Sequence, residues 1–219
     1  MNGRLKILVV SSAVLMSVGS FAPAEATTHL RPEAITSTFG SVDLLSDIRA
    51  GSSSSNAAGG ANLGNRFVFT ADNGLSGSEL WVTDGTPAGT TLLKDINSGS
   101  NGSGPTNYFV LGDKAFFMAN NGTVGYELWV TNGTEAGTTL VKDIESGSNG
   151  SYPSGFAAFG DNVVFVASTA AAGSETWISN GTSAGTTLLK DINPTGSSYP
   201  GSFFANNGTL YFRADDGTN

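Results

Sequence analysis

Residues 79–96 read ELWVTDGTPAGTTLLKDI, residues 127–144 read ELWVTNGTEAGTTLVKDI, and residues 175–192 read ETWISNGTSAGTTLLKDI. Each copy begins 48 residues after the copy before it, and residues 44–48 read LLSDI, a degenerate earlier copy of the same tail. A fixed period of this length indicates a repeat architecture, in which each repeat is one supersecondary unit. The repeat therefore decides the fold, and stacked copies of one small unit build the chain from residue 44 onward.

One period contains four short apolar runs, which we place at 108–111, 115–119, 127–131 and 138–144. Asn-Gly and Gly-Asp pairs separate them, and such pairs favour the tight turns of β-hairpins. No stretch after residue 26 has sustained helical periodicity. Four antiparallel strands in 48 residues match one blade of a β-propeller. A β-solenoid is the alternative, although its coils are usually shorter.

One apolar column supports blades over a flat sandwich. Phe69, Phe117, Phe165 and Phe212 recur at one position, each beside another apolar residue and each followed two residues later by alanine. We expect this strand, in all four copies, to be the inner strand of its blade and to be buried on both faces. The expected fold class is all-β: a β-propeller-like array of four-stranded antiparallel blades, with the last blade incomplete.

The ends of the chain predict export and an unfinished array. Residues 1–26 combine a basic start, a short apolar stretch and Ala24-Glu25-Ala26, which is the pattern of a secretory signal peptide. The apolar stretch is short for a membrane span of about 20 residues. We divide the rest into an N-terminal segment (27–43) and the repeat domain (44–219), and we expect a secreted or cell-surface protein without a membrane span after signal removal.

The last copy reaches Asn219 before its Glu-Leu-Trp strand. We interpret this as a fragment of a longer reading frame. The alternatives are a closed four-bladed ring or a homodimer that forms an eight-bladed ring.

Composition excludes several kinds of chemistry. The chain has no cysteine, so thiolate chemistry is excluded. It has one histidine, His29, which argues against a Ser-His-Asp triad and against a metal site with several histidine ligands. A formal net charge of −8 argues against nucleic-acid binding, which depends on a basic surface. The 30 glycines and the 13% share of charged residues fit many short strands joined by turns.

The recurring Glu-Leu-Trp-x-x-Asp-Gly-Thr segment with its Lys-Asp-Ile tail resembles a family of exported bacterial proteins named for this repeat. The resemblance extends from about Leu44 to Asn219, nearly the whole mature chain. It implies a secreted or surface-displayed propeller-like array, and it implies no reaction. The chain departs from the pattern at Asn132 and Asn180, where Asp is typical, and at Thr176, where Leu is typical.

Three glutamates, Glu79, Glu127 and Glu175, recur at one position in the repeat. Glycoside hydrolysis needs two carboxyl groups in different environments, whereas equivalent glutamates share one environment. We therefore interpret each as a structural residue that closes a hairpin or accepts backbone N–H groups at the start of a strand. The repeated Trp81, Trp129 and Trp177 are expected to pack between blades, with sugar stacking or the anchoring of a partner peptide as alternatives.

The remaining candidates lie in turns. Asp84, Asn132 and Asn180 follow the tryptophan strands and are expected to form hairpin turns. Asp72, Asn73, Asp215 and Asp216 are weak calcium candidates, because they gather oxygen atoms beside a tight turn. The third copy reads Ser-Thr-Ala at 168–170 and lacks these ligands, so plain turn chemistry is the favoured interpretation. No other cofactor is expected.

These observations predict an exported, non-enzymatic binding or display scaffold, with calcium as a candidate stabilising ion. Its partner would be a protein or a polysaccharide that the sequence does not identify. A polysaccharide-acting hydrolase on the same scaffold is the alternative, and it would require a unique acidic pair that the sequence does not contain outside the repeat.

Overall fold

The computed structural model describes residues 44–218. The predicted signal peptide (1–26), the N-terminal segment (27–43) and His29 lie outside the described residues. Residues 44–218 form strands, turns and irregular segments, and no helix among them is long and apolar enough to cross a membrane.

The strands form four antiparallel sheets that follow one another along the chain, and strands consecutive in sequence are neighbours in each sheet. Sheet A contains β1 (Ala58–Asn62), β2 (Phe67–Asp72), β3 (Ser78–Thr83) and β4 (Thr91–Lys94). Sheet B contains β5 (Thr106–Leu111), β6 (Lys114–Asn120), β7 (Tyr126–Thr131) and β8 (Thr139–Lys142). Sheet C contains β9 (Ser154–Phe159), β10 (Asn162–Thr169), β11 (Gly173–Ser179) and β12 (Thr187–Lys190). Sheet D is a hairpin of β13 (Gly201–Asn206) and β14 (Thr209–Arg213).

The same register relates the second and third strands in sheets A, B and C. Phe69 faces Trp81 across the sheet, Phe117 faces Trp129, and Phe165 faces Trp177. The alanine two residues after each phenylalanine faces the glutamate two residues before each tryptophan. Positions that share this register are called equivalent below.

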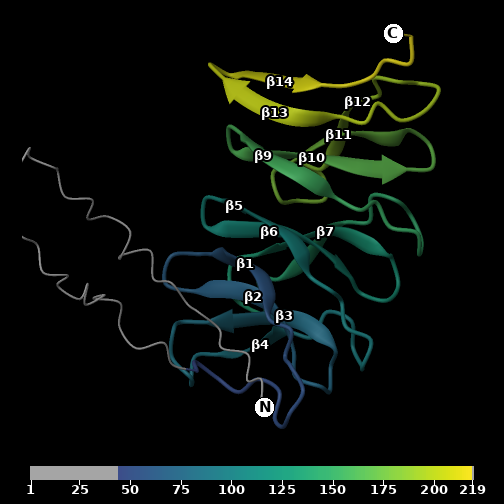
Figure 1. Ribbon diagram of the computed structural model, residues 1–219. Helices are drawn as coiled ribbons and strands as arrows, with labels where there is room; N and C mark the ends of the chain where they lie inside the picture. The colour runs from purple at the N-terminus through teal and green to yellow at the C-terminus, as the bar shows by residue number, and fades with distance from the viewer. Residues whose placement is uncertain (1–43, 219) are drawn as a thin grey trace, which may run out of the picture.

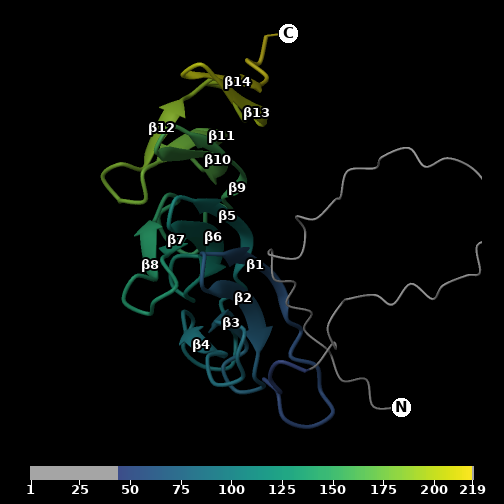
Figure 2. The same ribbon diagram turned by 90° about the vertical axis from the view of Figure 1, so that its left-hand side faces the viewer.

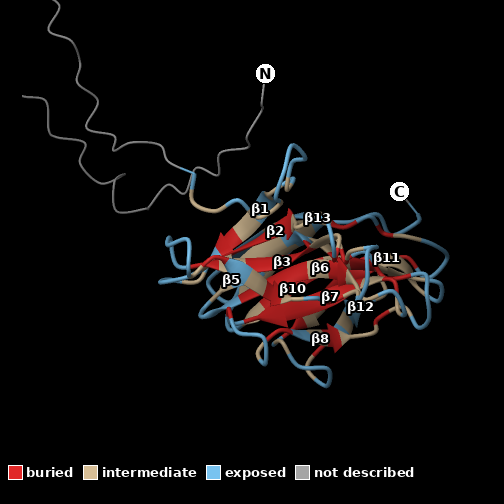
Figure 3. Ribbon diagram, turned by 90° about the horizontal axis from the view of Figure 1, so that it is seen from below, coloured by how far each residue is buried: buried red, intermediate tan, exposed pale blue. Residues whose placement is uncertain are grey.

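The sheets stack in chain order from sheet A to sheet D (Figure 1). Their first strands are neighbours, with β1 beside β5, β5 beside β9 and β9 beside β13. The stack is curved when seen from the side (Figure 2). Buried residues concentrate in the middle strands, whereas the connecting turns are exposed (Figure 3).

The core lies between successive sheets. One cluster joins Val68, Leu80 and Leu93 of sheet A to Phe117 and Trp129 of sheet B. A second cluster joins sheets B and C and contains Phe116, Val141, Phe165 and Trp177. Burying these side chains against the next sheet is the main stabilising interaction of the stack.

The predicted phenylalanine column is confirmed as a strand, with two corrections. It is the second strand of each sheet and not the innermost one. The first strand of each sheet is innermost, since it lies beside the first strand of the neighbouring sheet. The phenylalanine strand is also buried only in the first three copies. In sheet D, Tyr211 is 55% exposed and Phe212 is half-buried, because among residues 44–218 no sheet covers the far side of this hairpin.

Candidate functional site

The recurring glutamates are fully buried and accept hydrogen bonds from their own repeat and from the start of the next one. Glu127 accepts from the backbone N–H groups of Ile144 (3.1 Å), Glu145 (3.1 Å) and Ser151 (2.9 Å), and from the Ser151 hydroxyl (2.6 Å). Glu79 and Glu175 accept equivalent bonds from segments 96–103 and 192–198. Each carboxylate therefore links two segments by hydrogen bonds: the residues just after the fourth strand of its sheet and the segment that leads into the next sheet.

Burial determines the acid–base behaviour of two of these glutamates. Desolvation raises the pKa of Glu79 and of Glu127 above the ordinary value, and the hydrogen bonds from the serine and the backbone only partly offset it. A general acid or base must reach a proton of its substrate. The exposure of these side chains is 0%, and their oxygen atoms are occupied by donors of the chain, so the geometry favours a structural role.

The tryptophans pack between sheets. Trp129 belongs to the cluster between sheets A and B, Trp177 to the cluster between sheets B and C, and Trp81 to a smaller cluster with Phe69 and Ala71. Their exposed fractions are 8% for Trp81, 5% for Trp129 and 9% for Trp177. The three indole N–H groups are buried and donate to no group of the described residues, so these rings are held by apolar contacts alone.

The turns after the tryptophan strands are held by their own side chains. Asp84 Oδ1 accepts from the backbone N–H (2.9 Å) and the hydroxyl (2.7 Å) of Thr86. Asn132 and Asn180 accept the equivalent bonds from Thr134 and Thr182. The hydrogen bond from the Thr86 hydroxyl lowers the pKa of Asp84. Because Asn makes the same bonds as Asp, this position forms a turn without requiring a charge.

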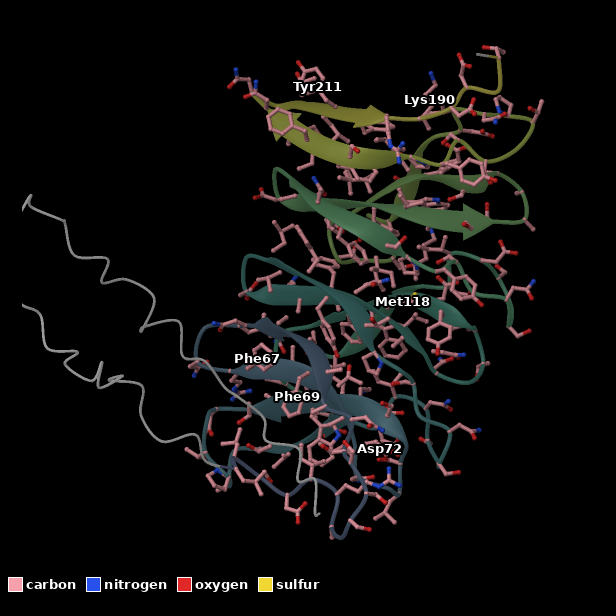
Figure 4. The ribbon with its side chains drawn as sticks, in the orientation of Figure 1. Phe67, Phe69, Asp72, Met118, Lys190 and Tyr211 are labelled. Carbon is pink, nitrogen blue, oxygen red and sulfur yellow. The ribbon has the colours of Figure 1, made fainter. Side chains whose placement is uncertain are left out.

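The calcium candidates also form side-chain-to-backbone turns. Asp72 Oδ1 accepts from Gly74 N–H (2.6 Å), and Asp72 Oδ2 pairs with Arg49. Asn73 Oδ1 accepts from the backbone N–H groups of Leu75 and Ser76 (both 2.9 Å). Figure 4 places Asp72 at the end of β2 opposite to the end occupied by Phe67.

The last calcium candidates, Asp215 and Asp216, accept from Gly217 N–H (2.8 Å) and Thr218 N–H (2.9 Å). Within residues 44–218, no group of three or more His, Asp or Glu side chains is arranged to hold a metal ion. The side-chain oxygen atoms of all four candidates thus accept hydrogen bonds from the backbone of their own turns.

Two tyrosines that the sequence analysis did not single out have strained backbones. Tyr152 (φ 52°) and Tyr199 (φ 46°) adopt the left-handed conformation, and they are 55% and 72% exposed. Asn56 and Gly104 occupy the equivalent positions with φ values of 47° and 56°. The four positions are equivalent because each directly follows a serine with the same hydrogen bond. The carbonyl of this serine accepts a backbone N–H from a residue at or just after the end of the second strand of the sheet that follows. The repeated Ser-Tyr-Pro at 151–153 and 198–200 was the available sequence signal.

Left-handed backbone geometry costs a bulky residue about 1–2 kcal/mol, and Gly or Asn avoids most of this cost. Tyr152 gains one ring contact, with Tyr126 at a centroid distance of 5.7 Å. The side chain of Tyr199 is 72% exposed, compared with 55% for Tyr152. The linker shared by the four repeats therefore imposes the left-handed conformation on both tyrosines, and residues held in this way are enriched at binding sites.

The two tyrosines lie on one edge of the stack, which we call the tyrosine edge. Tyr152 immediately precedes the segment leading into β9, and Tyr199 precedes the equivalent segment leading into β13, the strand beside β9. Stacked sheets lie about 10 Å apart, so the two rings are presented one sheet apart. The neighbouring linkers are rich in Ser, Asn and Gly, which offer neutral hydrogen-bonding groups.

Comparisons of this chain with protein-family models and with curated proteins found no match.

Proposed function

We propose that this chain is an exported, non-enzymatic scaffold that binds a neutral polysaccharide through the tyrosine edge. In this proposal each four-stranded sheet is one blade of a propeller-like array with a 48-residue repeat. The stacking of first strand beside first strand and the curvature of the stack support the blade interpretation (Figures 1 and 2). The signal-like residues 1–26 support export.

The observation that carries the proposal is the pair of exposed, left-handed tyrosines. A tyrosine ring has a flat apolar face and a polar hydroxyl, which suits a ligand with both apolar and hydroxyl surfaces. The neutral polar linkers beside these rings match a polysaccharide with little charge. Anionic ligands are disfavoured by the net charge of −8.

The buried glutamates support a non-enzymatic role over a polysaccharide hydrolase. Hydrolysis requires a proton donor and a second carboxylate on either side of the scissile bond. Glu79, Glu127 and Glu175 are each enclosed in the chain, and all three make the same kind of contact.

Affinity electrophoresis tests this function. The purified chain is run in gels that contain dextran, xylan or a mixed-linkage glucan, and in a plain gel. We expect at least one polysaccharide to retard it, without release of reducing ends. The double variant Tyr152→Asn/Tyr199→Asn should migrate as it does in the plain gel, because Asn56 shows that asparagine fits this backbone.

Tyr211→Ala is the matched control, since Tyr211 is as exposed as Tyr152 but lies on β14. It should be retarded like the unchanged chain. Equal retardation of the double variant, or no retardation in any of the three gels, would refute the proposal. Reducing ends released from any of the polysaccharides by the purified chain would favour the hydrolase.

A further inference from the structure

Seven Asn-Gly pairs occur in residues 44–218, and their surroundings differ. An Asn-Gly pair can react with itself, because the glycine nitrogen can attack the carbonyl carbon of the Asn side chain. Glycine hinders this attack least, since it has no β-carbon. The reaction in a folded chain has two local requirements. The Asn side chain must be free to turn toward the backbone, and the glycine N–H must be free of an acceptor.

Four of the pairs are held by hydrogen bonds of their own turns. In each, the Asn Oδ1 accepts from backbone N–H groups, and the glycine N–H donates to a side-chain oxygen. These held pairs are residues 73–74, 121–122, 132–133 and 180–181. In one of them, Asn132 Oδ1 accepts from the Thr134 N–H (3.1 Å) and hydroxyl (2.7 Å), and Gly133 N–H donates to the Thr131 hydroxyl (3.0 Å). The held pairs meet neither requirement.

Two further pairs, residues 101–102 and 149–150, lie in the linkers between sheets. A β-carbon on Gly77 would lie 2.5 Å from the nitrogen of Gly102. A β-carbon on Gly125 would likewise lie 2.5 Å from the nitrogen of the glycine in the second linker pair. The attacking nitrogen is thus enclosed by backbone in both linkers, which opposes its movement and the ring that would form on it.

The seventh pair, Asn207-Gly208, meets both requirements. The two residues form the turn between β13 and β14, at the tip of the hairpin (Figure 1). Both are exposed, with φ values of 47° and 74°. Among residues 44–218, no group makes a hydrogen bond with the Asn207 side chain or with the Gly208 N–H. A β-carbon on Gly208 would meet no atom within 4 Å, so the nitrogen of this glycine is open to approach.

The exposure of this turn is shared by the equivalent turns of complete sheets. Gly112-Asp113 of sheet B and Gly160-Asp161 of sheet C are also exposed, although another sheet follows each. They differ in the order of their residues. Glycine comes first, with φ values of 62° and 59°, and no glycine follows. Both orders suit a two-residue hairpin turn, but only Asn followed by Gly can react in this manner.

We propose that Asn207-Gly208 is a site of spontaneous covalent modification, at which Asn207 is converted to aspartate and isoaspartate. The Gly208 nitrogen loses its proton and forms a bond to Asn207 Cγ, and the bond from Cγ to the side-chain nitrogen breaks and releases ammonia. Water then opens the cyclic imide. Hydrolysis at the side-chain carbonyl carbon leaves aspartate, and hydrolysis at the main-chain carbonyl carbon leaves isoaspartate. Water is the co-reactant, and nothing is oxidised or reduced.

The modification changes the turn of sheet D. Isoaspartate adds one carbon atom to the backbone of a two-residue turn, whereas the register of the hairpin places Asn206 opposite Thr209. Both products also add a negative charge to a chain with a formal net charge of −8. The turn therefore records the age of the chain. This inference does not depend on the polysaccharide ligand proposed above.

Peptide mapping of the aged chain tests the site. The purified chain is incubated at mildly alkaline pH, where the glycine nitrogen loses its proton more readily, and samples taken over time are digested and analysed by mass spectrometry. Modification at Asn207 should be at least about tenfold faster than at Asn132, because the side chain of Asn132 must first leave the hydrogen bonds of its turn. The linker pairs should react at intermediate rates. An equal or faster rate at any other pair would overturn the proposal.

A variant and the unfolded chain are the controls. Asn207→Gly/Gly208→Asp gives this turn the residue order of the turns in sheets B and C, and it should abolish modification in the turn. An isoaspartyl methyltransferase, used as a probe, should label the aged unchanged chain more than the aged variant. In urea all seven pairs should react at similar rates. If Asn207 keeps its lead in urea, the neighbouring sequence and not the fold selects it, and the proposal is wrong.

Discussion

Sheet B and the β13–β14 hairpin have similar apolar second strands in different surroundings. Phe116 and Phe117 of β6 are 2% and 0% exposed, because sheets on both sides cover them. Tyr211, equivalent to Phe116, is 55% exposed, and its ring contacts Phe204, which is 63% exposed. The apolar pattern determines that a strand forms, and the neighbouring sheet determines whether it is buried.

The opposite end of the array is covered differently. The outer cluster of sheet A, formed by Phe69, Ala71 and Trp81, is packed against Ile48 and Ala57. Ile48 ends the degenerate LLSDI copy, so it provides the isoleucine that Ile96 provides to the next interface. A short remnant of one repeat therefore covers this end of the described array, whereas Phe204 and Tyr211 of the β13–β14 hairpin are exposed.

The largest loss of stability is expected from shortening a side chain of β6, which is covered on both faces, and it is compared with the same change in the exposed strand β14. Phe117→Ala should lower the free energy of unfolding by about 3–5 kcal/mol, because it leaves a cavity between sheets A and B. Tyr211→Ala should lower it by less than about 1 kcal/mol, because its ring lies mostly in solvent. Urea unfolding followed by tryptophan fluorescence measures both. Similar losses would show that solvent does not reach Tyr211 and that another group covers it.

The positions of the strands were well predicted by the sequence. The expected runs at 115–119 and 127–131 correspond to β6 and β7 within one residue at each end. The expected run at 138–144 was too long, since β8 ends at Lys142. The physical reason is that the N–H of Ile144 donates to the buried Glu127 carboxylate instead of a strand neighbour. An acceptor 17 residues away is invisible to local patterns.

The candidate site was predicted less completely. The glutamates were interpreted from the sequence as acceptors of backbone N–H groups, and the structure shows such bonds. The left-handed backbones of Tyr152 and Tyr199 could not be inferred from propensity, because tyrosine favours strands. The pair formed by Arg49 and Asp72 joins residues that only the fold brings together.

A smaller effect is expected from the carboxylate that links one sheet to the next. Glu127→Gln places an amide N–H₂ group among four donors, so it should lower the free energy of unfolding by about 1–3 kcal/mol. Glu135→Gln, an exposed change in the following turn, is the control and should have almost no effect.

The pH dependence of the Glu127→Gln variant sharpens this prediction. Burial raises the pKa of Glu127 in the folded chain above its unfolded value, so the folded state binds the proton more tightly. Its contribution to stability is therefore full below the unfolded pKa and decreases as the pH rises through the folded pKa. The stability difference between the unchanged chain and Glu127→Gln should be larger at about pH 4 than at pH 7. A smaller difference at pH 4 would mean that hydrogen bonding to the ionised form outweighs burial.

The covered N-terminal end predicts a still smaller loss. Ile48→Ala should lower the free energy of unfolding by about 1–2 kcal/mol, below the range for a fully buried isoleucine, because Ile48 is only half-buried. Leu44→Ala, at a residue that is 36% exposed, serves as the control and should cost less. If Ile48→Ala has no effect on unfolding, the remnant does not stabilise sheet A and the two ends are equivalent in energy.

The smallest effect is expected from calcium, which would act on the turns at both ends of the array. An ion that binds only the folded chain raises its melting midpoint with ion concentration. Asp72 is paired with Arg49 and Gly74, and Asn73 accepts from the turn backbone, so an incoming ion would have to break these contacts. We expect the melting curves with calcium and with chelator to coincide. Asp72→Asn should lower the free energy of unfolding by less than about 1 kcal/mol, through loss of a partly exposed ion pair. A midpoint that rises with calcium, and stops rising in Asp72→Asn, would instead place an ion in the turn after β2.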